Sequence, residues 1–325
     1  MNTKNKSFNF LTFLMAIVPA FVLLSIVGFV FYYSIPAIKF MGINFFTTFL
    51  WNPGIQSKPP EVVNGVLAPF GASFGILLFL LGTVVTSLLA LLIAFPLSFL
   101  LALTIELYTP LRLKRGLISL VELFAGIPSV VYGLWGIVVL EPVLLNSVEP
   151  WMSANLSFIP GFSGEVYTGA GIIASGIILS IMIAPIITSV MVNSFDTAPE
   201  GIKRGIISLG ATKWELGKYL ITNYSRSSTY GGTLLGLGRA LGETMAVLMV
   251  SGGLVNVYPG SIYSAINTMA AHIASYLDSA FFDSTGMNVA ALAYLGLVLM
   301  GISLVVNIIG RKIAGRGVLR GYESD

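Results

Sequence analysis

Residues 73–105 read SFGILLFLLGTVVTSLLALLIAFPLSFLLALTI, a run without a single charged side chain. A helix needs about 20 mainly apolar residues to cross the hydrocarbon core of a bilayer. The run is therefore long enough to span a membrane with some tilt. Pro96 lies inside it, and a proline within a helix produces a kink. This stretch predicts an all-α integral membrane protein.

The same apolar pattern recurs along the chain. We expect membrane helices near residues 10–34, 73–105, 115–140, 168–195, 222–255 and 287–311, with Gly126-Ile-Pro128 breaking the start of the third. Only 10% of the 325 residues are charged and the mean hydropathy is +0.90, whereas a soluble domain carries about a quarter charged residues. Six transmembrane helices are the prediction. The first is interpreted as a retained signal and anchor, with a cleaved signal peptide as the alternative.

The basic residues are distributed unevenly over the predicted loops. Of the 17 Lys and Arg residues, two (Lys39 and Lys58) fall in the loops 35–72, 141–167 and 256–286. The opposite side carries Lys4, Lys6, Arg112, Lys114, Arg115, Lys203, Arg204, Lys213, Lys218, Arg226, Arg311, Lys312, Arg316 and Arg320. Because cytoplasmic loops are enriched in Lys and Arg, both termini are predicted to be cytoplasmic. The loop 35–72 is interpreted either as a plain connection or as a docking surface.

The sequence lacks the residues that several kinds of binding site need. The chain has no Cys and a single His, His272, which we expect in an outer loop. We therefore predict no metal site, no cofactor bound by this chain and no nucleic-acid partner; membrane lipid is the surrounding partner. A G-x-x-x-x-G-K-[ST] phosphate loop is missing, and the nearest string, Gly210 to Lys218, has the wrong spacing. If ATP drives transport, another subunit must hydrolyse it.

The loop DTAPEGIKRGIISLGATKWELGKY, residues 196–219, is predicted to begin with a short amphipathic helix. Pro199 suits its first position, and Gly210 suits its end. Ile202, Ile206, Ile207 and Leu209 fall on one side of this helix, and Lys203 and Arg204 fall on the other. Such a helix either lies on the lipid surface or fits the groove of a partner protein.

Arg239 and Glu243 are two charges inside the apolar run 222–255. A charge at the bilayer centre costs about 2.5–3.5 kcal/mol on insertion scales, so such residues face protein or water. Positions i and i+4 share a helix face, and Gly232, Gly236 and Ala240 lie close to that face, which allows another helix to approach. The pair is interpreted either as a structural ion pair or as an oxyanion site, since Arg offers a planar fork of donors.

Three strings resemble the permeases of ABC importers, and the phosphate permeases of the PstC type in particular. They are Glu122-Leu-Phe-Ala-Gly-Ile-Pro-Ser-Val-Val-Tyr-Gly-Leu-Trp-Gly136, Leu209-Gly-Ala-Thr-Lys-Trp-Glu215 and Gly238-Arg-Ala-Leu-Gly-Glu-Thr-Met-Ala-Val247. The similarity runs from about Gly71 to Arg311, in the same order as in the family. It implies a type I ABC importer permease (MetI-like) bundle with an N-terminal helix and outer loop (1–70), a permease core (71–315) and a cytoplasmic tail (316–325).

The resemblance also implies partners and site residues. It implies a second homologous permease (PstA-like), a cytoplasmic ATPase dimer that binds ATP and Mg²⁺ (PstB-like) and an extracytoplasmic phosphate-binding protein (PstS-like), in the inner or plasma membrane of a prokaryotic cell. Arg239 and Glu243 would line the substrate pathway. The ATPase would grip Pro199, Ile202, Ile206, Leu209, Gly210, Ala211, Thr212, Trp214 and Glu215.

One part of the resemblance is incomplete. The family's coupling loop usually begins with Glu-Ala-Ala, where this chain has Arg204-Gly-Ile206. An ATPase adapted to a basic coupling helix is one hypothesis. The expected function is a transport subunit, not an enzyme: half of an ATP-driven phosphate importer. The alternatives are a permease for another oxyanion, such as sulfate or molybdate, and a secondary anion transporter that works without ATP.

Overall fold

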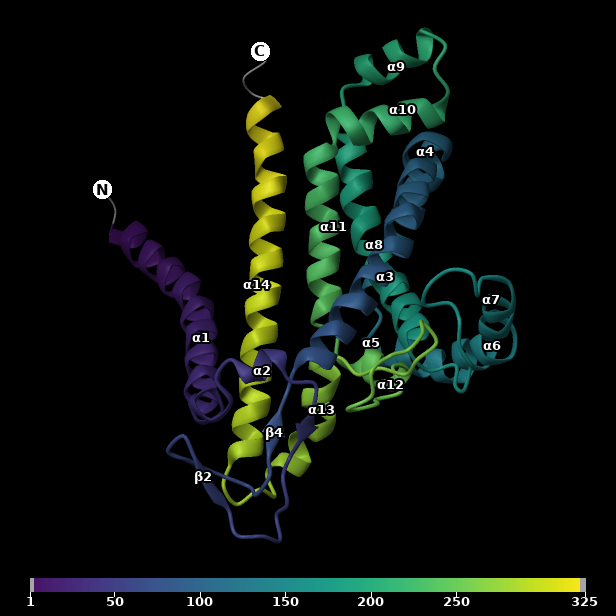
Figure 1. Ribbon diagram of the computed structural model, residues 1–325. Helices are drawn as coiled ribbons and strands as arrows, with labels where there is room; N and C mark the ends of the chain where they lie inside the picture. Colours follow the sequence, from purple (N-terminus) through teal and green to yellow (C-terminus); the bar gives the residue numbers. More distant parts are fainter. Residues whose placement is uncertain (1–2, 322–325) are drawn as a thin grey trace. The chain divides into compact units, whose positions relative to one another are not determined.

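The computed structural model describes residues 3–321, which are mostly helical. The helices are α1 (Thr3–Met41), α2 (Asn44–Thr47), α3 (Leu77–Leu103), α4 (Leu111–Ala125), α5 (Ser129–Trp135), α6 (Glu141–Val143), α7 (Glu149–Asn155), α8 (Ile172–Asp196), α9 (Glu200–Ser208), α10 (Lys213–Tyr219), α11 (Arg226–Leu241), α12 (Met245–Val250), α13 (Met269–Ala280) and α14 (Met287–Gly321) (Figure 1). The π-helical segments are η1 (Thr104–Tyr108), η2 (Gly136–Leu140), η3 (Leu144–Val148) and η4 (Leu220–Tyr224). The strands are β1 (Trp51–Asn52), β2 (Glu61–Val63), β3 (Val66–Ala68) and β4 (Ser73–Phe74).

Five helical stretches among the described residues are long and apolar enough to cross a membrane. They are Phe10–Met41, Leu77–Tyr108, Ser129–Asn155, Ile172–Asp196 and Met287–Ile313. Four of them confirm predicted helices, with ends displaced by a few residues. Residues 322–325, the end of the predicted tail, lie outside the described residues.

The third predicted helix, 115–140, is interrupted at the predicted break, but the apolar span that follows lies further along the chain than expected. The break expected at Gly126-Ile-Pro128 separates α4 from α5. Proline disfavours helical backbone at the residue before it, and the apolar stretch restarts at Ser129 and continues to Asn155.

The fifth predicted helix, 222–255, is wrong as a continuous element, because the structure divides it into two helices. Helix α11 ends at Leu241, and α12 begins at Met245. The amides of Gly242 and Glu243 bond the carbonyls three residues back, of Arg239 and Ala240, at 3.2 and 3.3 Å. Glycine is a poor helix former, and this tightened last turn ends the helix. Neither α11 nor α12 is long enough by itself to count among the five spans.

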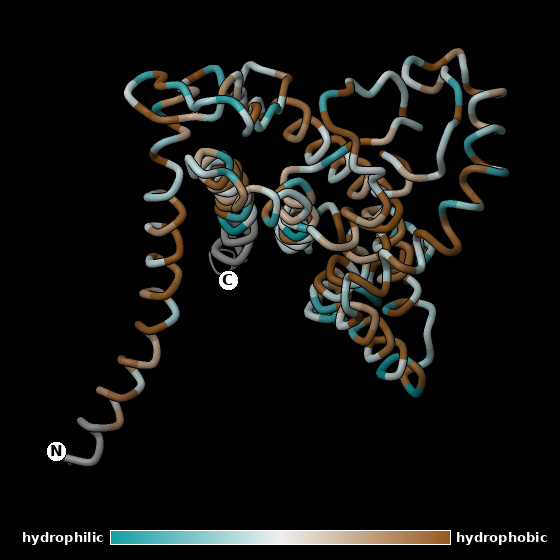
Figure 2. The backbone as a smooth tube through the Cα atoms, turned by 90° about the horizontal axis from the view of Figure 1, so that it is seen from below, coloured by the Kyte–Doolittle hydropathy of each residue, from teal (hydrophilic) through white to brown (hydrophobic). Residues whose placement is uncertain are grey.

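The chain divides into two compact units. The first comprises Met1–Leu77 and Tyr276–Met300. Its polar segment 35–72 is ordered: β1 pairs with β4, and β2 pairs with β3. Asn64 and Gly65 between β2 and β3 both have positive φ, 52° and 75°, as a tight hairpin turn requires. Apolar residues continue along most of α1 (Figure 2), and the most apolar window of this helix has no buried residue.

The second unit comprises Leu78–Ser275 and Gly301–Asp325, and α8 lies at its core. Helix α11 runs beside α8 (Figure 1). A Cβ atom on Gly232 would lie 2.6 Å from Val190 Cγ1, and one on Gly236 would lie 2.9 Å from Ile187 Cγ1. These contacts are too close for any side chain larger than hydrogen, so the predicted small-residue face of this helix is confirmed.

Candidate functional site

The segment that joins α8 to α11 forms two short helices, α9 and α10, beyond the ends of those longer helices (Figure 1). Pro199 precedes α9 as its cap residue, one position earlier than expected, and Glu200 is the first helical residue. Gly210 has φ of +90°, the left-handed conformation that ends helices. The predicted amphipathic helix is therefore present within the predicted bounds.

Helix α10 is held by a capping box between Thr212 and Glu215. The Glu215 amide donates to Thr212 Oγ1 at 3.2 Å, and the Thr212 amide donates to Glu215 Oε2 at 2.7 Å. The backbone hydrogen bond from Thr212, followed by the one from its hydroxyl, lowers the pKa of the Glu215 carboxyl. The T-x-x-E spacing is a sequence signal for this motif. Both residues were predicted for ATPase coupling, and both have a local structural role here.

Trp214 and Ala211 lie at the start of α10. The Trp214 ring packs edge-on against Phe99 of α3, with centroids 5.5 Å apart, yet the residue remains exposed. Ala211 is half-buried. The ring contact between Trp214 and Phe99 attaches α10 to α3.

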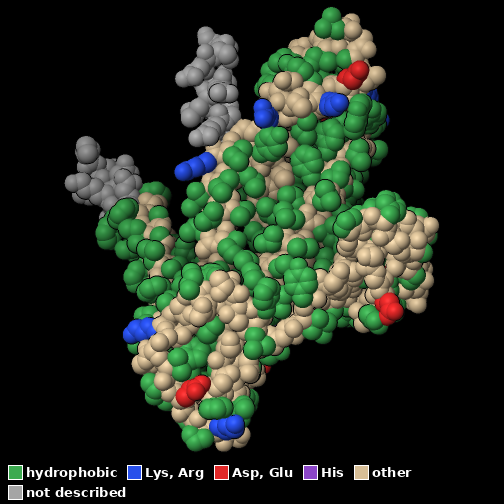
Figure 3. Space-filling view, in the orientation of Figure 1, with side chains coloured by type: hydrophobic (Ala, Val, Ile, Leu, Met, Phe, Trp, Pro, Cys, Tyr) green, Lys and Arg blue, Asp and Glu red, His purple; other side chains and the backbone are tan. Residues whose placement is uncertain are grey.

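The apolar side of α9 is uncovered. Leu209 is 88% exposed, and Ile202 and Ile207 are exposed as well, while Ile206 is partly buried. Hydrophobic and basic side chains lie next to one another over α9 and α10 (Figure 3). An exposed apolar stripe on a short helix marks an interaction surface.

Lys203 and Arg204 are predicted on the same side of the helix, but only Arg204 is exposed. The Lys203 side chain is only 8% exposed, whereas that of its neighbour Arg204 is 82% exposed. Lys203 Nζ lies 2.9 Å from Oε1 of Glu106, a residue of η1, and 3.4 Å from Oε1 of Glu200. Arg204 Nε is 3.7 Å from Glu200 Oε2.

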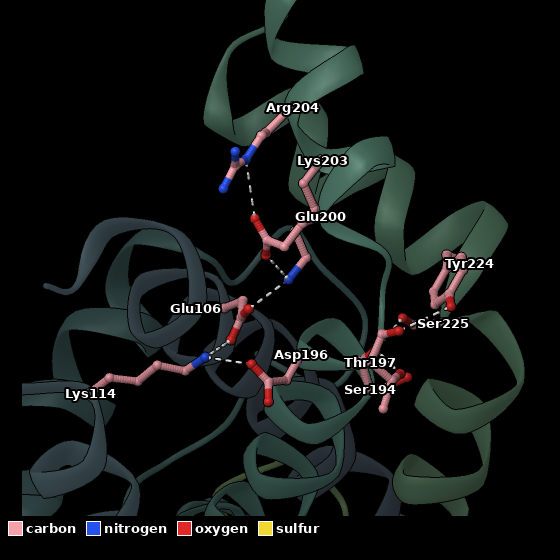
Figure 4. Close-up of polar contacts among 10 residues, drawn as sticks. All are labelled: Glu106, Lys114, Ser194, Asp196, Thr197, Glu200, Lys203, Arg204, Tyr224 and Ser225. Carbon is pink, nitrogen blue, oxygen red and sulfur yellow. Dashed lines mark hydrogen bonds and ion pairs between the residues drawn. The ribbon is translucent and has the colours of Figure 1, made fainter. Parts of the chain in front are cut away.

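Glu106 also forms an ion pair with a second lysine, Lys114 (Figure 4). Lys114 Nζ of α4 lies 2.6 Å from Glu106 Oε2 and 2.8 Å from Asp196 Oδ1, at the end of α8. Burial lowers the pKa of Lys114, but the hydrogen bonds and charges of Asp196 and Glu106 outweigh it, so the pKa of Lys114 is raised. We call Glu106, Lys114, Asp196 and Lys203 the charge cluster. Glu106 and Lys203 are 97 positions apart, so no local sequence pattern indicates the pairing.

Two further hydrogen bonds fix the approach to α11. Tyr224 Oη donates to the carbonyl of Thr197 at 3.1 Å, and Ser225 Oγ donates to that of Ser194 at 3.3 Å (Figure 4). The end of α8 and the start of α11 are thus linked directly.

Arg239 lies just before the helix break, and Glu243 lies within it. Arg239 is exposed in the last turn of α11, and Glu243 is half-buried between α11 and α12. Within the described part of the chain, neither side chain forms a hydrogen bond or an ion pair. The predicted face shared by the two charges and the small residues is not observed, because Gly236 and Ala240 are buried while Arg239 is exposed.

Helix α14 comes close to the same place. A Cβ atom on Gly238 would lie 2.8 Å from Asn307 Oδ1. A larger side chain at position 238 would have to displace the Asn307 side chain.

His272, expected in a loop, lies in α13 and is buried. Its ring stacks on that of Phe79 with centroids 4.0 Å apart. Burial lowers the pKa of His272 to about 3. The residue is therefore neutral at physiological pH and belongs to the packing of the second unit.

Comparison with known proteins gives consistent relatives. The chain is 41% identical over 287 residues to the phosphate transport system permease protein PstC 1 of Mycobacterium tuberculosis, covering 87% of this chain and 83% of the relative. It is 37% identical to PstC of Xylella fastidiosa over 85% of this chain and 79% of the relative. It is 35% identical to the probable PstC of Methanocaldococcus jannaschii over 88% of this chain and 85% of the relative.

Other comparisons add less. No known family profile matches the chain. A chain of the solved MetNI methionine ABC transporter is 16% identical and has a TM-score of 0.46, covering 72% of this chain and 93% of that one; a likeness at this score carries no weight for the assignment. The identity to the phosphate permeases over most of both lengths is sufficient by itself, and the chain belongs to the PstC family of phosphate transport system permease proteins.

Proposed function

We propose that this chain is the permease subunit of an ATP-driven importer of inorganic phosphate and forms half of the translocation pathway. The observation that carries the proposal is the 35–41% identity to phosphate permeases over most of the chain. The chain is a transport subunit and not an enzyme, and ATP and Mg²⁺ bind to a separate subunit.

The chain crosses the prokaryotic cell membrane six times, as a type I importer permease with both termini in the cytoplasm. Five spans are supported by long apolar helices. The sixth comprises α11 and α12 together with the break at residues 242–244. The excess of Lys and Arg on the side that carries α9 and α10 supports the orientation.

Phosphate passes Arg239 and Glu243. Irregular backbone at membrane depth is tolerated where it is buried in protein or lines a cavity, and interrupted helices of transporters commonly mark the substrate site. Arg239 adjoins such an interruption, and its guanidinium has no acidic partner among the described residues. Its planar donor fork fits the oxygens of a tetrahedral anion.

The uncovered side of α9 docks the ATPase dimer. Ile202, Ile207 and Leu209 supply the apolar contacts, and the exposed Arg204 supplies a basic one. The assembly also contains a second, PstA-like permease and an extracytoplasmic, PstS-like binding protein. An ATPase groove with an acidic residue opposite Arg204 would match the departure from the Glu-Ala-Ala pattern.

Uptake of radiolabelled phosphate by the reconstituted complex tests the proposal. We expect uptake that requires ATP, resists competition by sulfate and molybdate, and depends on an ATPase that co-purifies with the chain. Competition by sulfate or molybdate would reassign the cargo to another oxyanion. Uptake without ATP, by the chain purified alone, would make it a secondary transporter.

A further inference from the structure

Helix α9 is attached to the rest of its unit by an apolar contact of Ile206 and by the charge of Lys203. Its exposed residues include Arg204 and Glu200 as well as Ile202 and Ile207, and the one residue within it that is buried is Lys203. Burying an ammonium group is costly unless the group is paired and hydrogen-bonded. Glu106 is the carboxylate partner that Lys203 has outside α9, and Glu200 is a second one within the helix.

The partner, Glu106, connects α9 to three longer helices. It lies in η1, which continues α3, and its two carboxylate oxygens pair with different lysines. Oε1 accepts from Lys203 at 2.9 Å, and Oε2 lies 2.6 Å from Lys114 Nζ. Lys114 belongs to α4 and also contacts Asp196, the last residue of α8, at 2.8 Å. The charge cluster is thus a continuous chain of ion pairs from α9 through η1 and α4 to α8 (Figure 4).

The cluster is electrically balanced, with two carboxylates and two ammonium groups. The Glu106 side chain is only 4% exposed, so water screens its pairs little. Glu106 also lies in a π-helical turn, and such turns are frequently found at functional sites. A balanced, poorly screened cluster resists separation of its members.

We propose that the charge cluster is the mechanical link of this permease: Lys203, through Glu106, positions α9 so that a displacement of α9 carries the ends of α3, α4 and α8 with it. The inference rests on the proposed function, in which the ATPase grips α9. Lys203 and Glu106 act as positioning residues and do not contact phosphate.

A variant that removes both the Glu106 and Lys203 charges distinguishes a loss of stability from a loss of coupling between ATP hydrolysis and transport. Lys203→Met leaves the cluster with one excess negative charge, and Glu106→Gln leaves one excess positive charge. The double variant Glu106→Gln/Lys203→Met leaves the neutral pair of Lys114 and Asp196, so the burial penalty of either single change is relieved. Lys203→Arg keeps a cation that can pair with Glu106. Lys218→Met removes an exposed lysine of α10 and is the matched control.

The readout is phosphate imported per ATP hydrolysed by assembled, reconstituted complexes. In the double variant we expect this ratio to fall by roughly tenfold or more, with ATP hydrolysis retained. Lys203→Arg and Lys218→Met should keep the wild-type ratio. An assembled double variant with the wild-type ratio overturns the inference. Absence of phosphate import by the wild type would instead count against the proposed function.

A distance measurement decides the matter if the double variant does not assemble. The chain has no Cys, and a Cβ at Gly116 of α4 or Gly201 of α9 meets nothing within 4 Å, so Gly116→Cys and Gly201→Cys can carry spin labels. In the otherwise unchanged complex, we expect one distance between the labels, the same without nucleotide and with ATP trapped. A distance that changes between the two states shows that α9 moves independently and overturns the inference.

Discussion

At the scale of single residues, Lys203 and Arg204 are neighbours with opposite surroundings. Lys203 is buried against Glu106, and Arg204 is exposed beside Glu200. Removing one partner of a buried ion pair costs about 3–5 kcal/mol, an upper limit here because Glu106 keeps Lys114 at 2.6 Å. An exposed pair contributes about 0–1 kcal/mol. We predict that Lys203→Met lowers the thermal unfolding midpoint of the purified chain clearly, and that Arg204→Met barely changes it. Equal shifts for the two variants would contradict the placement of Lys203.

Glu215 provides a prediction about pH. Its folded pKa is lowered by the hydrogen bonds from Thr212, so its contribution to stability is present above the unfolded pKa of about 4.3 and is lost as the pH falls through the folded pKa. We expect Glu215→Gln to lower the unfolding midpoint at pH 7 and to have less effect near pH 3. Ser208→Ala, which removes an exposed hydroxyl in the same segment, is the control. A penalty that is the same at both pH values would argue against the ionised capping box.

How far residue roles can be predicted from sequence depends on whether their partners are local. Gly210 and Pro199 act within one turn of their neighbours, and their places at the two ends of α9 follow from the sequence. Helical spacing places Lys203 beside Ile206 and Ile207, three and four positions on, so its predicted place on the opposite side is wrong. Its partner Glu106 is 97 positions away, and no local pattern indicates that pairing. Arg239 is likewise taken for the partner of Glu243 only if the helix between them is continuous.

At the scale of elements, the exposed side of α9 yields a prediction for assembly. Leu209 is 88% exposed, so a charge at this position leaves the isolated chain intact while it disrupts an apolar contact with a partner. We predict that Leu209→Asp abolishes co-purification of the ATPase. Leu67→Asp, the same change at an exposed leucine of β3, should leave it unchanged. Normal recovery of the ATPase with Leu209→Asp would remove α9 from the docking surface.

Long apolar elements are predictable from sequence because their length alone distinguishes them. Helices near 10–34, 73–105, 168–195 and 287–311 are confirmed within several residues. The run 222–255 is misread because apolar composition continues across Gly242, where the backbone leaves the helix. Apolar composition indicates that a segment lies in lipid or in the protein interior. It does not show whether the helix is continuous, which depends on the backbone hydrogen bonds.

At the scale of the whole molecule, the orientation in the membrane can be tested with single cysteines, since the chain has none. Lys58→Cys lies between β1 and β2, and Lys218→Cys lies in α10; both positions are exposed. We predict that an impermeant thiol reagent added outside intact cells labels the first and reaches the second only after permeabilisation. Labelling of both from outside, or of Lys218→Cys alone, would contradict the proposed orientation.

The most direct measurement is ATP-driven phosphate uptake by reconstituted complexes that contain the wild type, Arg239→Gln or Arg226→Gln. The two arginines lie on the same helix, but Arg226 stands at its start, over the ring of Tyr230. If phosphate passes Arg239, the assembled Arg239→Gln complex loses uptake by roughly tenfold or more, while Arg226→Gln transports as the wild type does. Wild-type uptake by an assembled Arg239→Gln complex would contradict the proposed pathway.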